Sequence, residues 1–234
     1  MKTILMKFAG PLQSWGVGSH FETRQTQRYP SKSAVIGILA ASLGYRRHED
    51  EKIQQLNNLD FAVRIDQPGS TLRDYHIATK YKANGQVDRN YVTNRYYLQD
   101  AVFVVAISSE ENQLIDEIEK ALKSPYFQPF LGRRSLPMNA DFLIETRNEG
   151  IIESLDKTAW QAAKWYQNKA ENRLEVYVDS HCLPNSNKLT VRDKVVSFSQ
   201  KERKFGFRSI VKTYIEVDRI ENSTEHDAFG LLGG

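Results

Sequence analysis

The sequence has almost no cysteine and no long apolar run. A single cysteine, Cys182, occurs among the 234 residues, which excludes an internal disulfide and any site built from several cysteine ligands. No apolar run approaches the ~20 residues that span a bilayer. The short apolar start is interrupted by Lys7 and by Gly10-Pro11, unlike a secretion signal. We therefore expect a cytoplasmic protein, in a reducing compartment, with no membrane contact.

The motifs of common metal and cofactor sites are missing as well. None of the 5 histidines lies at a metal-ligand spacing from another histidine or from the cysteine, and HExxH and CxxC do not occur. The phosphate-loop pattern GxxxxGK[ST] is absent, and Gly10, Gly16 and Gly18 do not fit GxGxxG. The sequence therefore predicts no metal site and no cofactor.

Positive charge is unevenly distributed along the chain. Between Lys188 and Lys212 there are eight cations and two acidic residues, a formal charge of +6, while the whole chain carries only +3. The remainder therefore carries −3. Such asymmetry favours an anionic partner for one face, although a solvated lysine-rich surface has the same composition.

Apolar periodicity predicts a mixed α+β chain. Helices are expected from Ser31 or Ser33 to Gly44, over 49–57 and over 110–122. Strands are expected at 3–8, 61–65, 71–77, 97–108 and 142–146. This order resembles the ferredoxin-like (RRM-like) pattern of several RNA-binding modules.

A protruding β-hairpin is expected within this core. The residues from Ala78 to Asn94 include almost no aliphatic side chain, and Asn84-Gly85 is a strong hairpin-turn signal. We assign residues 1–148, with the hairpin at about 78–95, to the core. Residues 149–234 are expected to form a β-rich C-terminal extension or a small subdomain, with a loop and helix at 150–166, strands at 173–179 and 209–217, and a frayed tail from Glu221.

Four segments combine cations with aromatic or glycine residues, as surfaces that bind single-stranded nucleic acid do. They are Arg24 to Tyr29 with the following helix start, the hairpin, Leu131 to Arg134, and Lys201 to Arg208. Because free amides at a helix start attract phosphate, Lys32 and Ser33 belong to the first group. RNA binding is the hypothesis that these segments favour, and a protein-interaction module is the next.

A metal-free ribonuclease is the catalytic alternative. It needs a general base, a general acid and a cation beside one phosphate. Suitable residue types occur at Tyr45-Arg46-Arg47-His48 and at His76. A lone histidine is more often structural or solvated, so the non-catalytic interpretation is preferred.

Several motifs resemble those of the CasD subunits of type I-E CRISPR Cascade complexes, in the RAMP superfamily. The matching motifs, in family order, are Phe8 to Gly16 (FAGPLQSWG), Tyr29 to Gly37 (YPSKSAVIG), Leu43 to Arg47, Tyr97 to Ala101, Leu131 to Ser135, and the late basic stretch from Arg192 to Arg208. Ser31 and Ala34 replace the usual threonine and glycine.

The resemblance implies a ferredoxin-like subunit that binds the 5′ handle of a CRISPR RNA. It also implies that the hairpin is a thumb reaching toward the adjacent backbone subunit, and that the large subunit docks nearby and target DNA is met through the complex. Related nucleases use a tyrosine with a Lys-His pair. This chain has no Lys-His dipeptide, so no catalytic residue is expected although Tyr45 is present.

The candidate RNA-binding residues combine both lines of reasoning. They are Arg24, Arg28, Tyr29, Lys32, Ser33, Tyr45, Arg46, Arg47, Tyr81, Arg89, Tyr91, Arg95, Arg133, Arg134, Arg192, Arg203 and Arg208.

Overall fold

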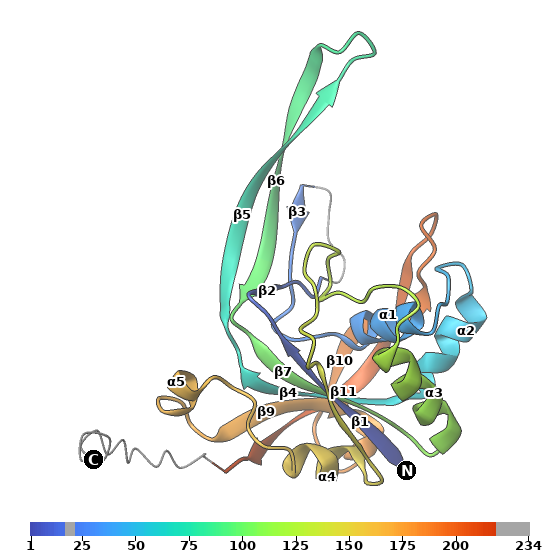
Figure 1. The fold of residues 1–234 in the computed structure, drawn as a ribbon, viewed down its shortest axis with the longest axis vertical. Coiled ribbons are helices and arrows are strands. Elements are labelled where there is room, and N and C mark those ends of the chain that lie inside the picture. The colour runs from blue at the N-terminus through green and yellow to red at the C-terminus, as the bar shows by residue number, and fades with distance from the viewer. Residues whose placement is uncertain (17–21, 219–234) are drawn as a thin grey trace, which may run out of the picture.

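The computed structural model describes residues 1–16 and 22–218. It is a mixed α+β structure in which antiparallel sheets dominate, as expected (Figure 1). The expected tail from Glu221 lies outside the described residues. None of the helices in the described ranges is long and apolar enough to cross a membrane.

Seven strands form the main sheet, in the order β10-β11-β9-β4-β7-β1-β8. Their bounds are β1 Lys2–Ala9, β4 Asp60–Gln67, β7 Val102–Ser109, β8 Leu143–Arg147, β9 Arg173–Asp179, β10 Lys188–Ser197 and β11 Lys204–Glu216. β4 pairs with both β7 and β9, with Ala62 opposite Val178 in the second pair. The strands after residue 149 therefore continue the sheet of the preceding residues.

The central strands β1, β4 and β7 are buried on both faces of this sheet, and alternate residues of each strand point to opposite sides. Ile4 and Phe8 of β1 pack with the helices α1 (Lys32–Ser42) and α3 (Asn112–Lys123). Leu5 packs on the other side with α4 (Ile151–Asp156). Burial on two faces explains why β7 is apolar at nearly every position. Four further short helical segments are α2 (Asp50–Gln55), η1 (Leu56–Asn58), α5 (Lys164–Gln167) and η2 (Ser180–Cys182).

The first helix begins and ends where the sequence indicates. The Ser31 side chain is the N-cap and accepts a hydrogen bond from the Ala34 amide at 3.3 Å. Gly44, just past the end of α1, has a φ of +78°, a left-handed conformation that suits glycine.

The expected strand at 97–108 is wrong, because the chain turns within it. Residues up to Gln99 belong to β6 (Val87–Gln99) and residues from Val102 to β7. Asp100 between them has a φ of 55°, a conformation that aspartate tolerates better than most residues. Its carbonyl accepts a hydrogen bond from Gln67 Nε2 at 2.6 Å. An apolar run alone could not reveal this turn.

A long two-stranded hairpin leaves the body of the protein beside this turn (Figure 1). β5 (Ser70–Tyr81) pairs with β6 from Ser70 opposite Gln99 to Tyr81 opposite Val87. The hairpin expected at 78–95 is the outer part, and the strand expected at 71–77 is its base. With 13 residues, β6 extends over ~40 Å at about 3.3 Å per residue. β2 (Leu12–Gln13) and β3 (Thr23–Arg24) add short edges to the base of β6.

The strand β10 was not expected from sequence, since the late basic stretch was interpreted only by its charge. Its inner half alternates between exposed and buried positions, so the cations Arg192 and Lys194 occupy the solvent side while Asp193, Val195 and Ser197 point inward. The stretch therefore forms a hairpin at the end of the main sheet.

Candidate nucleic-acid interface

One face of the long hairpin collects cations and rings. The register places Lys80 opposite Arg89, Ala78 opposite Tyr91, and Asp74 opposite Arg95, and directly opposite residues of a pair point to the same side. Arg24 of β3 lies beside Arg95 in the same sheet. We call the set of Arg24, His76, Arg89, Tyr91, Arg95 and Arg133 the cationic face.

Arg133 reaches this face from a distant turn. Gly132 has a φ of +89°, and a side chain there would put Cβ at 1.6 Å from the Ser14 carbonyl oxygen, so only glycine allows the turn to approach so closely. Arg133 Nη2 donates to the carbonyls of Arg24 and Tyr96, both at 3.1 Å. Its guanidinium lies 4.2 Å from the Tyr97 ring centroid. The Gly-Arg-Arg segment is thus joined to the base of the hairpin.

Two guanidinium groups on this face have hydrogen-bonding capacity left over. Among the described residues, Arg95 Nε and Arg133 Nη1 are buried and have no hydrogen-bond partner. Arg95 Nη2 lies 3.4 Å from His76 Nδ1, and Arg89 lies 4.8 Å from the Tyr91 ring centroid. Unsatisfied buried donors are costly. Both donors belong to guanidinium groups, which pair readily with anions such as phosphate.

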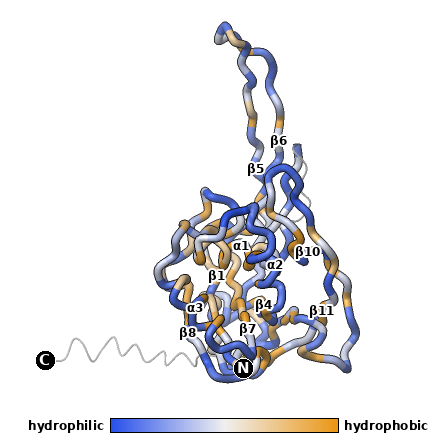
Figure 2. Tube along the Cα trace, turned by 90° about the vertical axis from the view of Figure 1, so that its right-hand side faces the viewer, coloured by the Kyte–Doolittle hydropathy of each residue, from blue (hydrophilic) through white to orange (hydrophobic). Residues whose placement is uncertain are grey.

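The opposite face of the same hairpin exposes several apolar side chains. Tyr75, Ile77 and Val92 have exposed fractions of 58%, 50% and 44%. Ile77 lies directly opposite Val92. Figure 2 shows apolar positions interspersed along this otherwise hydrophilic projection. We call these three residues the apolar face; strand alternation separates it from the cationic face.

A second basic region lies near α2 and β10. The two elements are joined where Gln54 Nε2 donates to the Val196 carbonyl at 2.7 Å. Arg46 and Arg47 are exposed in the turn before α2, and Arg192 and Arg203 are exposed on the β10–β11 hairpin. The structure thus places candidates from two distant segments on neighbouring elements.

Three candidate residues are in the interior, which corrects their expected role. The Lys32 ammonium donates to the carbonyls of Asn57 and Leu59 and to Asp179 Oδ2 at 2.9, 2.5 and 2.9 Å. Its backbone amide, expected to attract phosphate, donates instead to Asp193 Oδ2 at 2.9 Å. Ser33 is buried against Ser31. Burial lowers the pKa of Lys32, against the opposing effect of Asp179.

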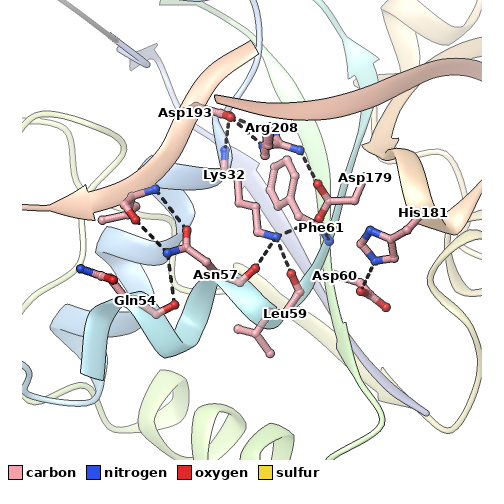
Figure 3. Close-up of polar contacts among 11 residues, drawn as sticks. Lys32, Gln54, Asn57, Leu59, Asp60, Phe61, Asp179, His181, Asp193 and Arg208 are labelled. Carbon is pink, nitrogen blue, oxygen red and sulfur yellow. Dashed lines mark hydrogen bonds and ion pairs between the residues drawn. The ribbon is translucent and has the colours of Figure 1, made fainter. Parts of the chain in front are cut away.

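Arg208 completes this interior network (Figure 3). It binds both carboxylate oxygens of Asp193, at 2.6 and 2.9 Å, and Asp179 Oδ1 at 2.6 Å. We call Lys32, Asp179, Asp193 and Arg208 the interior charge network. Lys32 and Arg208 are therefore held by carboxylates of their own chain rather than presented to RNA.

The aromatic candidates differ in what they contact. Tyr29 stacks on Tyr177 with ring centroids 4.2 Å apart, and burial is the largest of the causes that raise its pKa to about 12. Tyr45 packs against the core and lies under the Lys52 ammonium. Tyr81 is 62% exposed near the tip of the hairpin. Of these three, Tyr81 offers the most open ring face.

The remaining predicted residues are exposed. Arg28 precedes Tyr29, and Arg134 follows Arg133 on the turn at the hairpin base.

Sequence reasoning missed Lys80, which lies opposite Arg89, and the two carboxylates of the interior charge network. Alternation along β5 could have indicated Lys80, but no local signal links Asp179 to Lys32.

Comparisons with known proteins agree with this architecture. The family described as CRISPR-associated protein (Cas_Cas5) matches residues 3–211. The CRISPR system Cascade subunit CasD of Escherichia coli (strain K12) is 34% identical over an alignment of 157 residues that covers 61% of this chain and 70% of CasD. The chain therefore belongs to the Cas5 family of CRISPR-associated proteins, and the resemblance to CasD subunits is confirmed.

Solved structures give the same result. A chain of a CRISPR RNA-guided surveillance complex has 32% identity and a TM-score of 0.76, covering 92% of this chain and 90% of its own length. A structure described as a Cas protein has 30% identity and a TM-score of 0.66, covering 92% and 95%. The sheets described above are thus shared with related proteins along most of the chain.

The interior charge network can be tested through stability. Asp179→Ala leaves two buried cations without a shared partner, so the free energy of unfolding should fall by about 3 to 5 kcal/mol. Asp116→Ala is the matched control, because Asp116 pairs with Lys2 while 58% exposed and its loss should cost less than about 1 kcal/mol. Urea unfolding measures both values. Equal losses in the two variants would contradict a structural role for the network.

Proposed function

We propose that the chain is a subunit of a Cascade-type CRISPR RNA-guided complex and binds the 5′ handle of the CRISPR RNA. Membership of the Cas5 family and similarity to a Cascade subunit support this role. The observation that carries it is the cationic face, where side chains from β3, β5, β6 and the Gly132 turn converge on one side of the hairpin.

The chemistry of this face suits an unpaired RNA strand. Arginine forks onto phosphate, and a tyrosine ring stacks on a base whatever its identity. Arg95 and Arg133 supply the buried donors that lack partners. Arg89 and Tyr91 extend the surface along β6. In RNA-guided complexes the guide selects the target by base pairing, so the protein needs to hold the strand rather than read its sequence.

The core that carries this face is proposed to be ferredoxin-like. The strands β4-β7-β1-β8, with α1 after β1 and α3 after β7, have the order that the pattern requires. The hairpin β5–β6 would be the thumb of this core. We keep residues 1–148 as the core and residues 149–234 as an extension that lengthens the same sheet.

The apolar face is proposed to contact protein. Three exposed apolar side chains on a projection that no core supports are costly in water and suit an interface. We assign this face to the adjacent backbone subunit of the complex. The large subunit would dock on the body, and target DNA would be met through the complex. We propose that this assembly occurs in the cytoplasm.

A non-catalytic role is proposed for the chain. The specific observation that keeps a ribonuclease as the second candidate is His76, which lies within the cationic face beside Arg95. However, His76 also contacts the Thr93 hydroxyl at 3.4 Å. No second histidine or carboxylate is hydrogen-bonded to it among the described residues, so a general acid–base pair is not assembled.

Two exposed arginines on opposite faces of the hairpin test RNA binding. Arg89→Ala removes a phosphate contact from the cationic face, so the affinity for handle RNA should fall about tenfold and the salt dependence of log K should weaken by ~0.7. Arg73→Ala is the matched control, since Arg73 lies opposite Tyr96 on the other side of the hairpin. It should leave the affinity unchanged. Fluorescence anisotropy with labelled RNA measures both; an equal loss from both variants would assign the effect to net charge alone.

The apolar face is tested by assembly. Ile77→Ser should reduce co-purification with the backbone subunit about tenfold or more, because a buried isoleucine contributes about 1.5 to 3 kcal/mol. RNA affinity of the isolated chain should not change. Val196→Ser provides the control. Val196 is a 39% exposed valine on β10, outside the β5–β6 hairpin. Assembly unaffected by Ile77→Ser would remove the apolar face from the proposed interface.

The non-catalytic role is tested with repeat RNA in EDTA. We expect the purified chain to leave the RNA intact, because no acid–base pair is assembled around His76. Denaturing gel electrophoresis over several hours provides the measurement, with a known ribonuclease as positive control. Cleavage that His76→Ala or His48→Ala abolishes would establish the enzymatic alternative instead.

A further inference from the structure

Three side chains with metal-binding donors meet beside the interior charge network. Asp60 begins β4, while His181 and Cys182 belong to η2 (Ser180–Cys182), the turn directly after β9. Since β4 and β9 pair antiparallel with Ala62 opposite Val178, the same register places Asp60 opposite Ser180. The turn η2 then brings His181 and Cys182 over Asp60, although 121 residues separate His181 from Asp60.

The donor atoms form a compact group. The carboxylate oxygen, imidazole nitrogen and thiol sulfur all lie within 4.8 Å of one another. His181 Nε2 and Asp60 Oδ1 are 2.6 Å apart (Figure 3). We propose that Asp60, His181 and Cys182 form a zinc site.

The donor set selects the class of metal. Zinc accepts sulfur, imidazole nitrogen and carboxylate oxygen together, whereas magnesium and calcium require oxygen ligands throughout. Three protein ligands leave the fourth tetrahedral position for water. Because the His181 side chain is 65% exposed, this fourth coordination position faces solvent.

The group needs only a small rearrangement to bind. Zinc bonds of about 2.1 Å to nitrogen and oxygen set ligand atoms roughly 3.4 Å apart in a tetrahedron, so the imidazole must move away from Asp60 by less than one bond length. Its exposure allows that rotation, while Asp60 is largely buried at 16% side-chain exposure. A zinc ion would replace the direct contact between the two side chains and draw in the sulfur.

Asp60 supplies the negative charge of the site. The neighbouring carboxylate of Asp179 is already paired with Lys32 and Arg208. The bound ion would join the start of β4 to the end of β9. Zinc would therefore stabilise the attachment of the last three strands to the rest of the sheet.

Cobalt spectroscopy tests the site with the full chain. Cobalt(II) replaces zinc in such sites, and a cobalt–thiolate bond produces a charge-transfer band in the near ultraviolet. Because Cys182 is the single cysteine of the chain, the band has one possible source. We expect it to saturate at one equivalent of cobalt and to disappear when zinc is added.

Variants identify the ligands. Cys182→Ser should abolish the band, and Asp60→Asn and His181→Ala should each weaken cobalt binding at least tenfold. His48→Ala, which alters an exposed histidine elsewhere, should behave like the natural sequence. Circular dichroism verifies that each variant is folded. A band that fails to form in the natural chain overturns the proposal even if a variant does not fold.

Thermal unfolding provides the second measurement. Zinc should raise the melting temperature of the natural chain and of His48→Ala but not of Cys182→Ser, and magnesium should have no effect. A zinc shift that persists in Cys182→Ser would place the metal elsewhere and overturn the assignment. RNA affinity in EDTA should be unchanged, so failure of the zinc site and failure of handle binding are separately observable.

Discussion

The interior charge network of Lys32, Asp179, Asp193 and Arg208 is the interaction on which the placement of the other elements depends. These residues come from α1, β9, β10 and β11, and Asp179 also accepts the Phe61 amide of β4 at 3.0 Å. Removing such charges from water is costly unless every partner is present. The network therefore favours the one arrangement in which the last strands extend the sheet and the start of α1 faces β10.

Strand alternation produces the second constraint, because it separates the hairpin into two surfaces of different composition. In β6, odd-numbered residues such as Arg89 and Arg95 share one side, while Val92 lies on the other. A shift of register by one residue would mix the two sets. The bend at Asp100 and the close approach of Gly69 to the Gln99 carbonyl fix where this alternating ribbon leaves the sheet.

The sequence predicted the elements that are determined by residues close to them in the chain. Ser31 and Gly44 define the ends of α1, and Asn84-Gly85 predicts the hairpin turn. The prediction failed at Asp100, because the apolar residues at the end of β6 and those of β7 are close enough in sequence to be taken as one strand. It also failed to separate exposed cations from buried ones: the partner of Lys32 lies 147 residues away, and no pattern near Lys32 encodes Asp179.

The number of cations between Lys188 and Lys212 consequently overstates how much positive charge this segment presents to solvent. Arg208 is neutralised by two carboxylates inside the protein, and Lys204 and Lys212 pair with Glu202 and Glu175. Arg95 and Arg133, from segments with less apparent charge, instead retain buried donors without partners. An anion gains most where donors are already desolvated and unsatisfied. We therefore propose the hairpin base, rather than the stretch richest in cations, as the position for an RNA phosphate.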